Sequence, residues 1–132
     1  MFIDPYHFRF LLPLKLEWRI RTREKKIFLT FDDGPTPLIT PVILEILQRF
    51  NVAATFFCVG ENVVKHPVEY QSILEAGHAV GNHGYNHLKG WETPLDEYIE
   101  NVAKCASVVD SQLFRPPYGK FTLKQYHALK TD

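Results

Sequence analysis

The sequence predicts an α/β fold in which parallel strands are joined by helices. Past residue 26, short apolar runs typical of strands alternate with segments whose apolar residues recur at helical spacing. Such repeats give parallel strands with right-handed crossovers, and the chemistry of these folds gathers on loops at the carboxyl ends of the strands. Polar loops follow three of the four expected strands, so we expect one concave site at that edge.

The first half of the chain contains two expected strands and two expected helices. Residues 27–31 and 52–59 are apolar enough to form the strands. Between them, Thr40 is expected to cap a helix that has Pro41 at its first position. A second helix is expected from about residue 68 to Gly77, because glycine suits a left-handed helix end.

The second half repeats the alternation. Residues 78–81 form the expected third strand, and a loop follows to residue 91. The run Thr93-Pro94-Leu95-Asp96 has the pattern of a capping box and predicts a helix with apolar positions from Tyr98 to Val109. Residues 112–114 form the expected fourth strand, and a last helix runs from about 122 toward 129.

Composition bounds the class of protein. The chain has 132 residues, of which 45% are hydrophobic, enough for one domain with a core. Basic and acidic residues number 15 each, so no net charge favours nucleic acid or an acidic membrane as a partner. We expect an N-terminal lead-in at residues 1–26 and a partial domain at 27–132.

Neither targeting nor disulfide chemistry is indicated. The apolar stretch at residues 8–16 is interrupted by charges and a proline, has no small-residue cleavage site and is too short to span a bilayer. We therefore expect no signal peptide and no transmembrane segment, and a cytoplasmic location by default. Cys58 and Cys105 are too few for a disulfide scaffold and are expected to be small buried residues.

Two adjacent acids, Asp32 and Asp33, end the first apolar run. Neighbouring side chains on a strand point in different directions, so one carboxylate can hold a cation while the other moves a proton. Gly34 and Pro35 turn the chain immediately afterwards. We expect this pair to be catalytic.

A His-x-x-x-His pair, His83 and His87, follows the third expected strand. This spacing brings two imidazoles to one face of a helical turn, which suits one divalent ion. Either Asp32 or Asp33 could supply a third ligand, and such a set leaves positions for water. The alternative is a surface loop with two incidental histidines.

Arg115 stands before two prolines that fix the shape of its loop. An arginine held in this way can form a forked pair with a carboxylate and keep it ionised. The amide of Tyr118 is then free to donate to a developing oxyanion. The alternative is an exposed arginine before a turn.

Three motifs in this order resemble those of the polysaccharide deacetylases, the NodB-homology carbohydrate esterases. They span residues 30–35, 83–87 and 115–119, and the similarity extends over about 26–129. The resemblance implies a distorted (β/α) barrel, of which about four β/α units are present. Members of this family are often exported.

The resemblance also implies roles for individual residues. Asp33, His83 and His87 would hold a divalent metal, most often Zn²⁺, with Co²⁺ or Ni²⁺ as alternatives. Asp32 would be the general base that activates water, oriented by Arg115. The Tyr118 amide and the metal would stabilise the oxyanion, and the implied partner is an acetylated oligo- or polysaccharide.

Two departures from the family pattern are visible. Gly84 stands where members usually have Ser or Thr, a hydroxyl that braces the histidine loop. Two later motifs, an Asp/Trp segment and a Leu-x-His segment with the catalytic acid, do not occur in this chain. An incomplete barrel of this kind should pair with another copy, aggregate, or cover its edge with the N-terminal segment.

Three hypotheses for function follow. The first is a metal-dependent deacetylase of N-acetylated sugar polymers. The second is a catalytically incomplete remnant or sugar-binding module without the catalytic acid. The third is a hydrolase of other non-peptide carbon–nitrogen bonds, such as those of cyclic amides, on the same fold.

Overall fold

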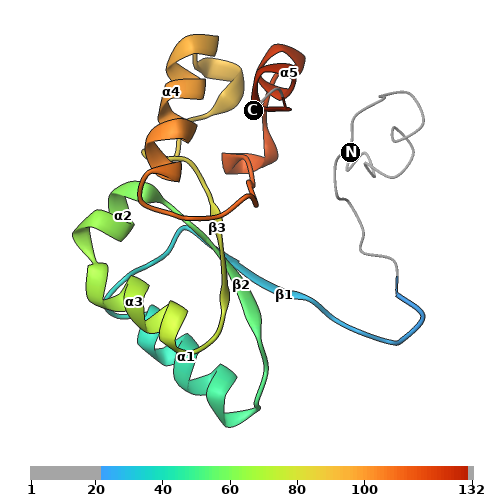
Figure 1. Ribbon diagram of the computed structural model, residues 1–132, viewed down its shortest axis with the longest axis vertical. Helices are drawn as coiled ribbons and strands as arrows, with labels where there is room; N and C mark the ends of the chain where they lie inside the picture. The colour runs from blue at the N-terminus through green and yellow to red at the C-terminus, as the bar shows by residue number, and fades with distance from the viewer. Residues whose placement is uncertain (1–21, 131–132) are drawn as a thin grey trace.

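The computed structural model describes residues 22–130 and shows a parallel sheet covered by helices (Figure 1). Three strands lie in the order β1 (Leu29–Asp32), β2 (Ala54–Cys58) and β3 (Ala79–Asn82), and both neighbouring pairs are parallel. The predicted α/β class with parallel strands is confirmed. Each strand is offset from its predicted limits by one or two residues. Most of the predicted lead-in and the apolar stretch within it lie outside the described residues.

The prediction of a fourth strand at residues 112–114 is wrong. The pairing there is reduced to one parallel bridge between Asn82 and Phe114. The Asn82 amide donates to the Leu113 carbonyl (2.8 Å), and the Arg115 amide donates to the Asn82 carbonyl (3.0 Å). Two prolines follow directly, and since proline has no N–H the pairing cannot continue. The short contact nevertheless places Arg115 at the carboxyl end of β3.

The described residues also form five α-helices and two 3₁₀ turns. They are α1 (Thr40–Arg49), α2 (Gly60–Lys65), α3 (Pro67–Glu75), α4 (Leu95–Ala106), α5 (Leu123–Lys130), η1 (Gly90–Glu92) and η2 (Pro117–Gly119). Of these, α1, α2 and α3 connect the strands. The helix α2 was not predicted, because it has only six residues and the proline that begins α3 ends its pattern. None of the helices between residues 22 and 130 has the length and apolar character that a membrane crossing needs.

Both predicted N-terminal helix caps are wrong, whereas Gly77 has the predicted left-handed conformation (φ 77°) just after α3. Thr40 is the first residue of α1 and Ile39 is its N-cap; the Thr40 hydroxyl accepts instead from the Thr36 amide (2.9 Å). No side chain caps α4. The Thr93 hydroxyl donates to the Lys89 carbonyl (2.7 Å), so it closes the preceding turn.

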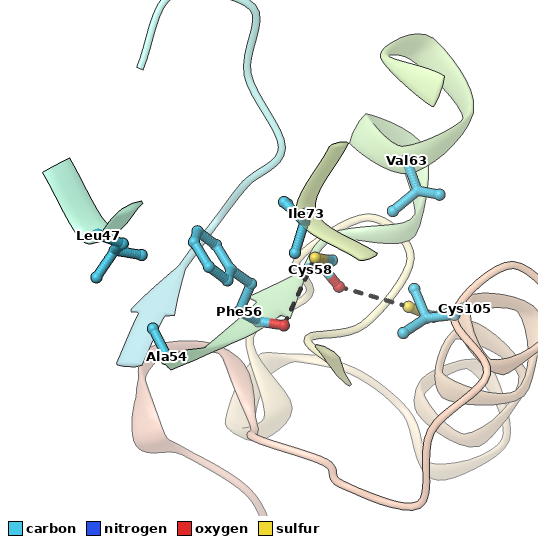
Figure 2. Packing of buried hydrophobic residues seen from close by; sticks show 8 residues of the cluster. Leu47, Ala54, Phe56, Cys58, Val63, Ile73 and Cys105 are labelled. Carbon is cyan, nitrogen blue, oxygen red and sulfur yellow. Dashed lines mark hydrogen bonds between the residues drawn. The ribbon is translucent and has the colours of Figure 1, made fainter. Parts of the chain in front are cut away.

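The hydrophobic core lies between β2 and the helices that follow β1, β2 and β3 (Figure 2). Its buried members are Leu47, Ala54, Phe56, Cys58, Val63, Ile73, Cys105 and Val109. Both cysteines are fully buried and free, as predicted. Burial raises the pKa of the Cys58 thiol to about 12, which makes it an unreactive packing group.

The helices cover the sheet unevenly. Figure 1 shows α1 and α3 side by side, whereas α4 lies beyond β3 and contacts α2 and α5. Among the described residues, β1 pairs only with β2, and its Leu29 is 39% exposed. The expected open edge is therefore present, and self-association through it stays a prediction.

Truncation of Ile73 should test the core. Ile73 is fully buried where α3 packs toward the sheet, so Ile73→Ala should lower the free energy of unfolding by about 2–5 kcal/mol. Urea denaturation measures this change. The neighbouring Leu74, which is 39% exposed, provides the control: Leu74→Ala should cost about 0.5 kcal/mol or less. Equal losses in the two variants would contradict this packing.

Candidate metal centre and active site

Three ligand-type side chains meet at the carboxyl ends of the strands. Asp33 directly follows β1, and His83 and His87 follow β3. Their ligand atoms lie within 4.8 Å of one another. Asp33 Oδ1 is 3.0 Å from His87 Nε2 and 3.4 Å from His83 Nε2. Of the two aspartates that the sequence left open, the structure places Asp33 beside the histidines.

The tautomer of His83 is fixed by its surroundings. His83 Nδ1 lies 2.7 Å from the Arg115 carbonyl oxygen. A carbonyl can only accept, so Nδ1 carries the proton and Nε2 presents a lone pair toward Asp33. Burial lowers the pKa of His83 below its usual value, although the bond to the Arg115 carbonyl opposes this shift. The neutral, ligand-competent imidazole is thereby favoured.

The donor set fits a small divalent cation. Zinc ligands 2.0–2.1 Å from the metal in a tetrahedron stand roughly 3.3 Å apart, close to the 3.0 and 3.4 Å from Asp33 Oδ1 to the two imidazoles. An anionic oxygen that faces imidazole lone pairs is stabilised when a cation lies between them. Two histidines and one carboxylate also suit cobalt and nickel.

The backbone of Asp33 is held in an unusual conformation. Its φ is 70°, in the left-handed region, which costs a residue other than glycine on the order of 1–3 kcal/mol. Asn62 Nδ2 donates to the Asp33 carbonyl (2.8 Å), and the Val59 amide donates to the Gly34 carbonyl (3.0 Å). The start of α2 therefore holds the backbone that carries the Asp33 carboxylate.

The histidine loop is not the predicted helical turn. It is irregular, and Gly84 has a φ of 74°. Asn82 Oδ1 accepts from the Gly84 amide (2.8 Å), and Asn101 Oδ1 on α4 accepts from the amides of Tyr85 and Asn86 (2.8 and 3.2 Å). Two asparagine side chains thus brace the loop, in which Gly84 has no side-chain hydroxyl to do so. A Cβ at Gly84 would be strained and would lie 3.3 Å from Asn101 Oδ1.

Arg115 joins the second aspartate. One nitrogen, Nη1, donates to both Asp32 Oδ1 (2.6 Å) and Thr30 Oγ1 (2.9 Å). The expected partnership is present, but the predicted forked geometry is wrong, because a single nitrogen contacts the carboxylate. The guanidinium also lies over the Phe57 ring, 3.9 Å from its centroid. The arginine is fixed by a hydroxyl, a carboxylate and an aromatic face.

Tyr118 is in the left-handed region, with a φ of 57°. The amides of the next two residues donate to the carbonyls of Pro116 and Pro117, whereas no residue between 22 and 130 accepts from the Tyr118 amide. The Tyr118 ring centroid lies 4.7 Å from that of His87. The Tyr118 amide is thus available to donate, and the Tyr118 ring lies beside His87.

A separate cleft of about 600 Å³ lies between α1 and α3. It is lined by residues such as Leu44, Glu69 and His78 and by none of the predicted site residues. In the part of the chain that the structure describes, the Asp33–His83–His87 group is the one that could hold a metal ion. This group lies at the carboxyl ends of the strands and not in the cleft.

Sequence reasoning missed four bracing residues, Thr30, Asn62, Asn82 and Asn101. Thr30 lies two positions before Asp32 and shares its face of β1, so strand periodicity could have indicated it. Asn62 and Asn101 act from helices 29 and 15 residues away from the backbone groups they hold. No local pattern in one sequence marks such contacts.

A parallel α/β sheet with an Asp–His–His group beside an Asp–Arg pair is an arrangement of the metal-dependent hydrolase class. The model of the polysaccharide deacetylase family matches residues 19–131. The chain belongs to the polysaccharide deacetylase family. Members of this family are metalloenzymes, and the described residues include a group able to hold a metal.

Named relatives agree with this assignment. The chain is 39% identical over 108 residues to a peptidoglycan-N-acetylglucosamine deacetylase of Bacillus cereus, covering 77% of this chain and 50% of the relative. It is 33% identical over 111 residues to a chitooligosaccharide deacetylase of Azorhizobium caulinodans, covering 79% and 53%. The chain spans about half the length of these curated relatives.

A solved structure supports the fold. The crystal structure of the Bc1960 peptidoglycan N-acetylglucosamine deacetylase matches with a TM-score of 0.74 and 36% identity, covering 79% of this chain and 51% of that one. Its family has the NodB-type (β/α) barrel, so the predicted fold is confirmed for the part of the barrel present here.

Removal of either Asp33 or His87 should abolish stoichiometric zinc binding. Asp33→Ala and His87→Ala each leave two ligands, too few for a stable site in this open setting. Metal content after equilibrium dialysis measures the effect, with His127→Ala on the exposed face of α5 as the control. Full metal retention in either ligand variant would contradict the ligand set.

Asn62→Ala should weaken zinc binding about 10- to 100-fold without changing its stoichiometry at saturation. The reason is that the Asp33 backbone loses its brace while all three ligand side chains remain. Competition with a chelating dye measures the affinity. Gln71→Ala, on the exposed part of α3, is the matched amide control, and an equal effect in both variants would refute the bracing role.

Proposed function

We propose that this chain is a metal-dependent hydrolase that removes acetyl groups from N-acetylated sugar polymers. The observation that carries the proposal is the separation of two adjacent acids. Asp33 faces His83 and His87, whereas Asp32 faces Arg115. A deacetylase of this kind needs both a metal ligand and a free carboxylate next to it.

The metal-facing group would be Asp33, His83 and His87. A divalent ion held there supplies Lewis-acid polarisation of the acetyl carbonyl and makes water more acidic. Zinc is the ion we propose, with cobalt and nickel as alternatives, because the set has two imidazoles and one carboxylate.

Asp32 is proposed as the general base. Its carboxylate accepts the proton of the attacking water, and the Arg115 guanidinium holds it in orientation through the 2.6 Å contact. Thr30 shares the same nitrogen of Arg115 and limits its movement. The Asp32 side chain is 37% exposed, so a bound substrate can cover the remaining surface of the carboxylate.

The Tyr118 amide is proposed to donate to the oxygen of the acetyl group as negative charge develops there. A backbone donor is already oriented, so it needs no reorganisation when the charge appears. The named relatives act on peptidoglycan and chito-oligosaccharides, as their names state. We accordingly propose a chain of N-acetylated amino sugars as the substrate and residues 27–132 as the part of the chain that binds it.

Acetate release from chitotetraose tests the proposal. Zinc-loaded protein should release acetate, and Asp32→Asn should lower the rate by roughly 10²- to 10⁴-fold, because the general base is lost. The metal content of both samples should be equal, since Asp32 is not in the ligand group. Asp96→Asn, an exposed acid on α4, is the control and should leave the rate unchanged.

The outcomes separate the hypotheses. Metal-loaded protein that binds chitotetraose and releases no acetate would refute the deacetylase proposal in favour of a sugar-binding module. Ring opening of a cyclic amide without acetate release would favour the other carbon–nitrogen hydrolases. A rate that Asp32→Asn leaves unchanged would remove Asp32 from the mechanism.

A further inference from the structure

Trp91 is a large aromatic residue that the fold holds at the surface. It lies in η1, between the histidine loop and α4, and is 67% exposed. An exposed tryptophan on a mobile loop would not by itself indicate a binding site. Trp91 differs because hydrogen bonds hold both the backbone around it and its side chain.

The backbone of this turn is held by a buried amide. Gln125 on α5 is 1% exposed, and its Nε2 donates to the carbonyls of Gly90 (2.8 Å) and Thr93 (3.2 Å). Its Oε1 accepts from the Thr122 amide (2.8 Å). A buried amide is costly unless its hydrogen bonds are made, and here they connect both sides of Trp91 to α5.

The indole itself is also oriented. Trp91 Nε1 donates to the Phe121 carbonyl (3.0 Å), so the polar edge of the ring is already satisfied by the protein. The Lys120 ammonium lies 5.2 Å from the indole centroid. Because this ammonium lies over one face of the indole, what remains for a ligand is the other apolar face, held in one orientation.

Tyr118 and Lys89 lie between His87 and Trp91 on the surface. The ring of Tyr118 is 4.7 Å from His87, and Tyr118 is 56% exposed. The Lys89 ammonium lies 5.8 Å from the Tyr118 centroid, two positions before Trp91. A side chain at Gly90 would collide with the Lys120 carbonyl, so the turn that carries Trp91 lies directly against the loop after Tyr118.

We propose that Trp91 forms a sugar-stacking subsite beside the metal centre, which takes an N-acetylglucosamine unit next to the one that reacts. This inference rests on the proposed function and extends it to an oligomeric substrate. The apolar face of a sugar ring packs on an aromatic ring, and a ring held before binding loses little rotamer freedom. Lys89 is paired with Glu92 at 3.3 Å, so a neutral glycan suits this rim.

Nuclear magnetic resonance can follow the subsite without using catalysis. In a Trp18→Phe background Trp91 is the single remaining tryptophan, so its indole N–H signal is unambiguous. Chitotetraose should shift this signal saturably in the presence of EDTA, because the subsite contains no metal ligand. If the signal does not shift, the proposal is refuted. Because Trp91 is not substituted in this test, a folding defect at this position cannot explain such a result.

Calorimetry of substituted chains gives the size of the effect. Trp91→Ala should weaken chitotetraose binding roughly 3- to 10-fold, whereas Trp91→Tyr should keep most of the affinity. Phe50→Ala is the matched control, since Phe50 is also 67% exposed and has Arg49 5.8 Å from its ring, but lies at the end of α1. Equal binding by Trp91→Ala and the parent chain, or equal losses in Trp91→Ala and Phe50→Ala, would refute the subsite.

The subsite and the proposed function can fail separately. An indole shift with no acetate release would keep the subsite and refute the hydrolase. Acetate release with an unmoved indole signal would keep the hydrolase and refute the subsite.

Discussion

The arrangement of the site depends on Arg115. Its carbonyl accepts from His83 Nδ1 (2.7 Å), its guanidinium donates to Asp32 (2.6 Å), and the same group lies over the Phe57 ring. One residue thereby connects the ends of β1, β2 and the loop after β3. The two prolines that follow restrict its backbone, so its carbonyl and its side chain are positioned together. The orientation of the His83 imidazole and that of the Asp32 carboxylate are consequently linked.

The two aspartates illustrate how neighbours acquire different roles. Asp32 ends β1 with regular strand geometry, whereas Asp33 adopts a positive φ and turns toward the histidines. Such a conformation persists only where surrounding contacts stabilise it. Asn62 provides one of these contacts. A short helix that looks unimportant in the sequence is therefore part of the site.

The residues that meet at the site were predictable from the sequence, because the carboxyl ends of parallel strands share one edge of the sheet. The meeting of one aspartate with His83 and of the other with Arg115 follows from that rule, whereas which aspartate takes which place does not. The geometry was not predictable. The histidine loop depends on Asn101 from a distant helix, and the expected fourth strand fails where proline removes the next donor. The contact from Asn101 is long-range and leaves no local pattern, whereas the two prolines after Arg115 are visible in the sequence.

The segment from His83 to Thr93 contains both histidines and Trp91. Side chains from two different helices hold its two parts. Asn101 on α4 holds the part with the histidines, and Gln125 on α5 holds the part with Trp91. Contacts that share no partner act independently to a first approximation. A change at one clamp should therefore leave the other part of the segment in place. The proposed metal site and the proposed glycan subsite are thus physically separable, although a single loop supplies residues to both.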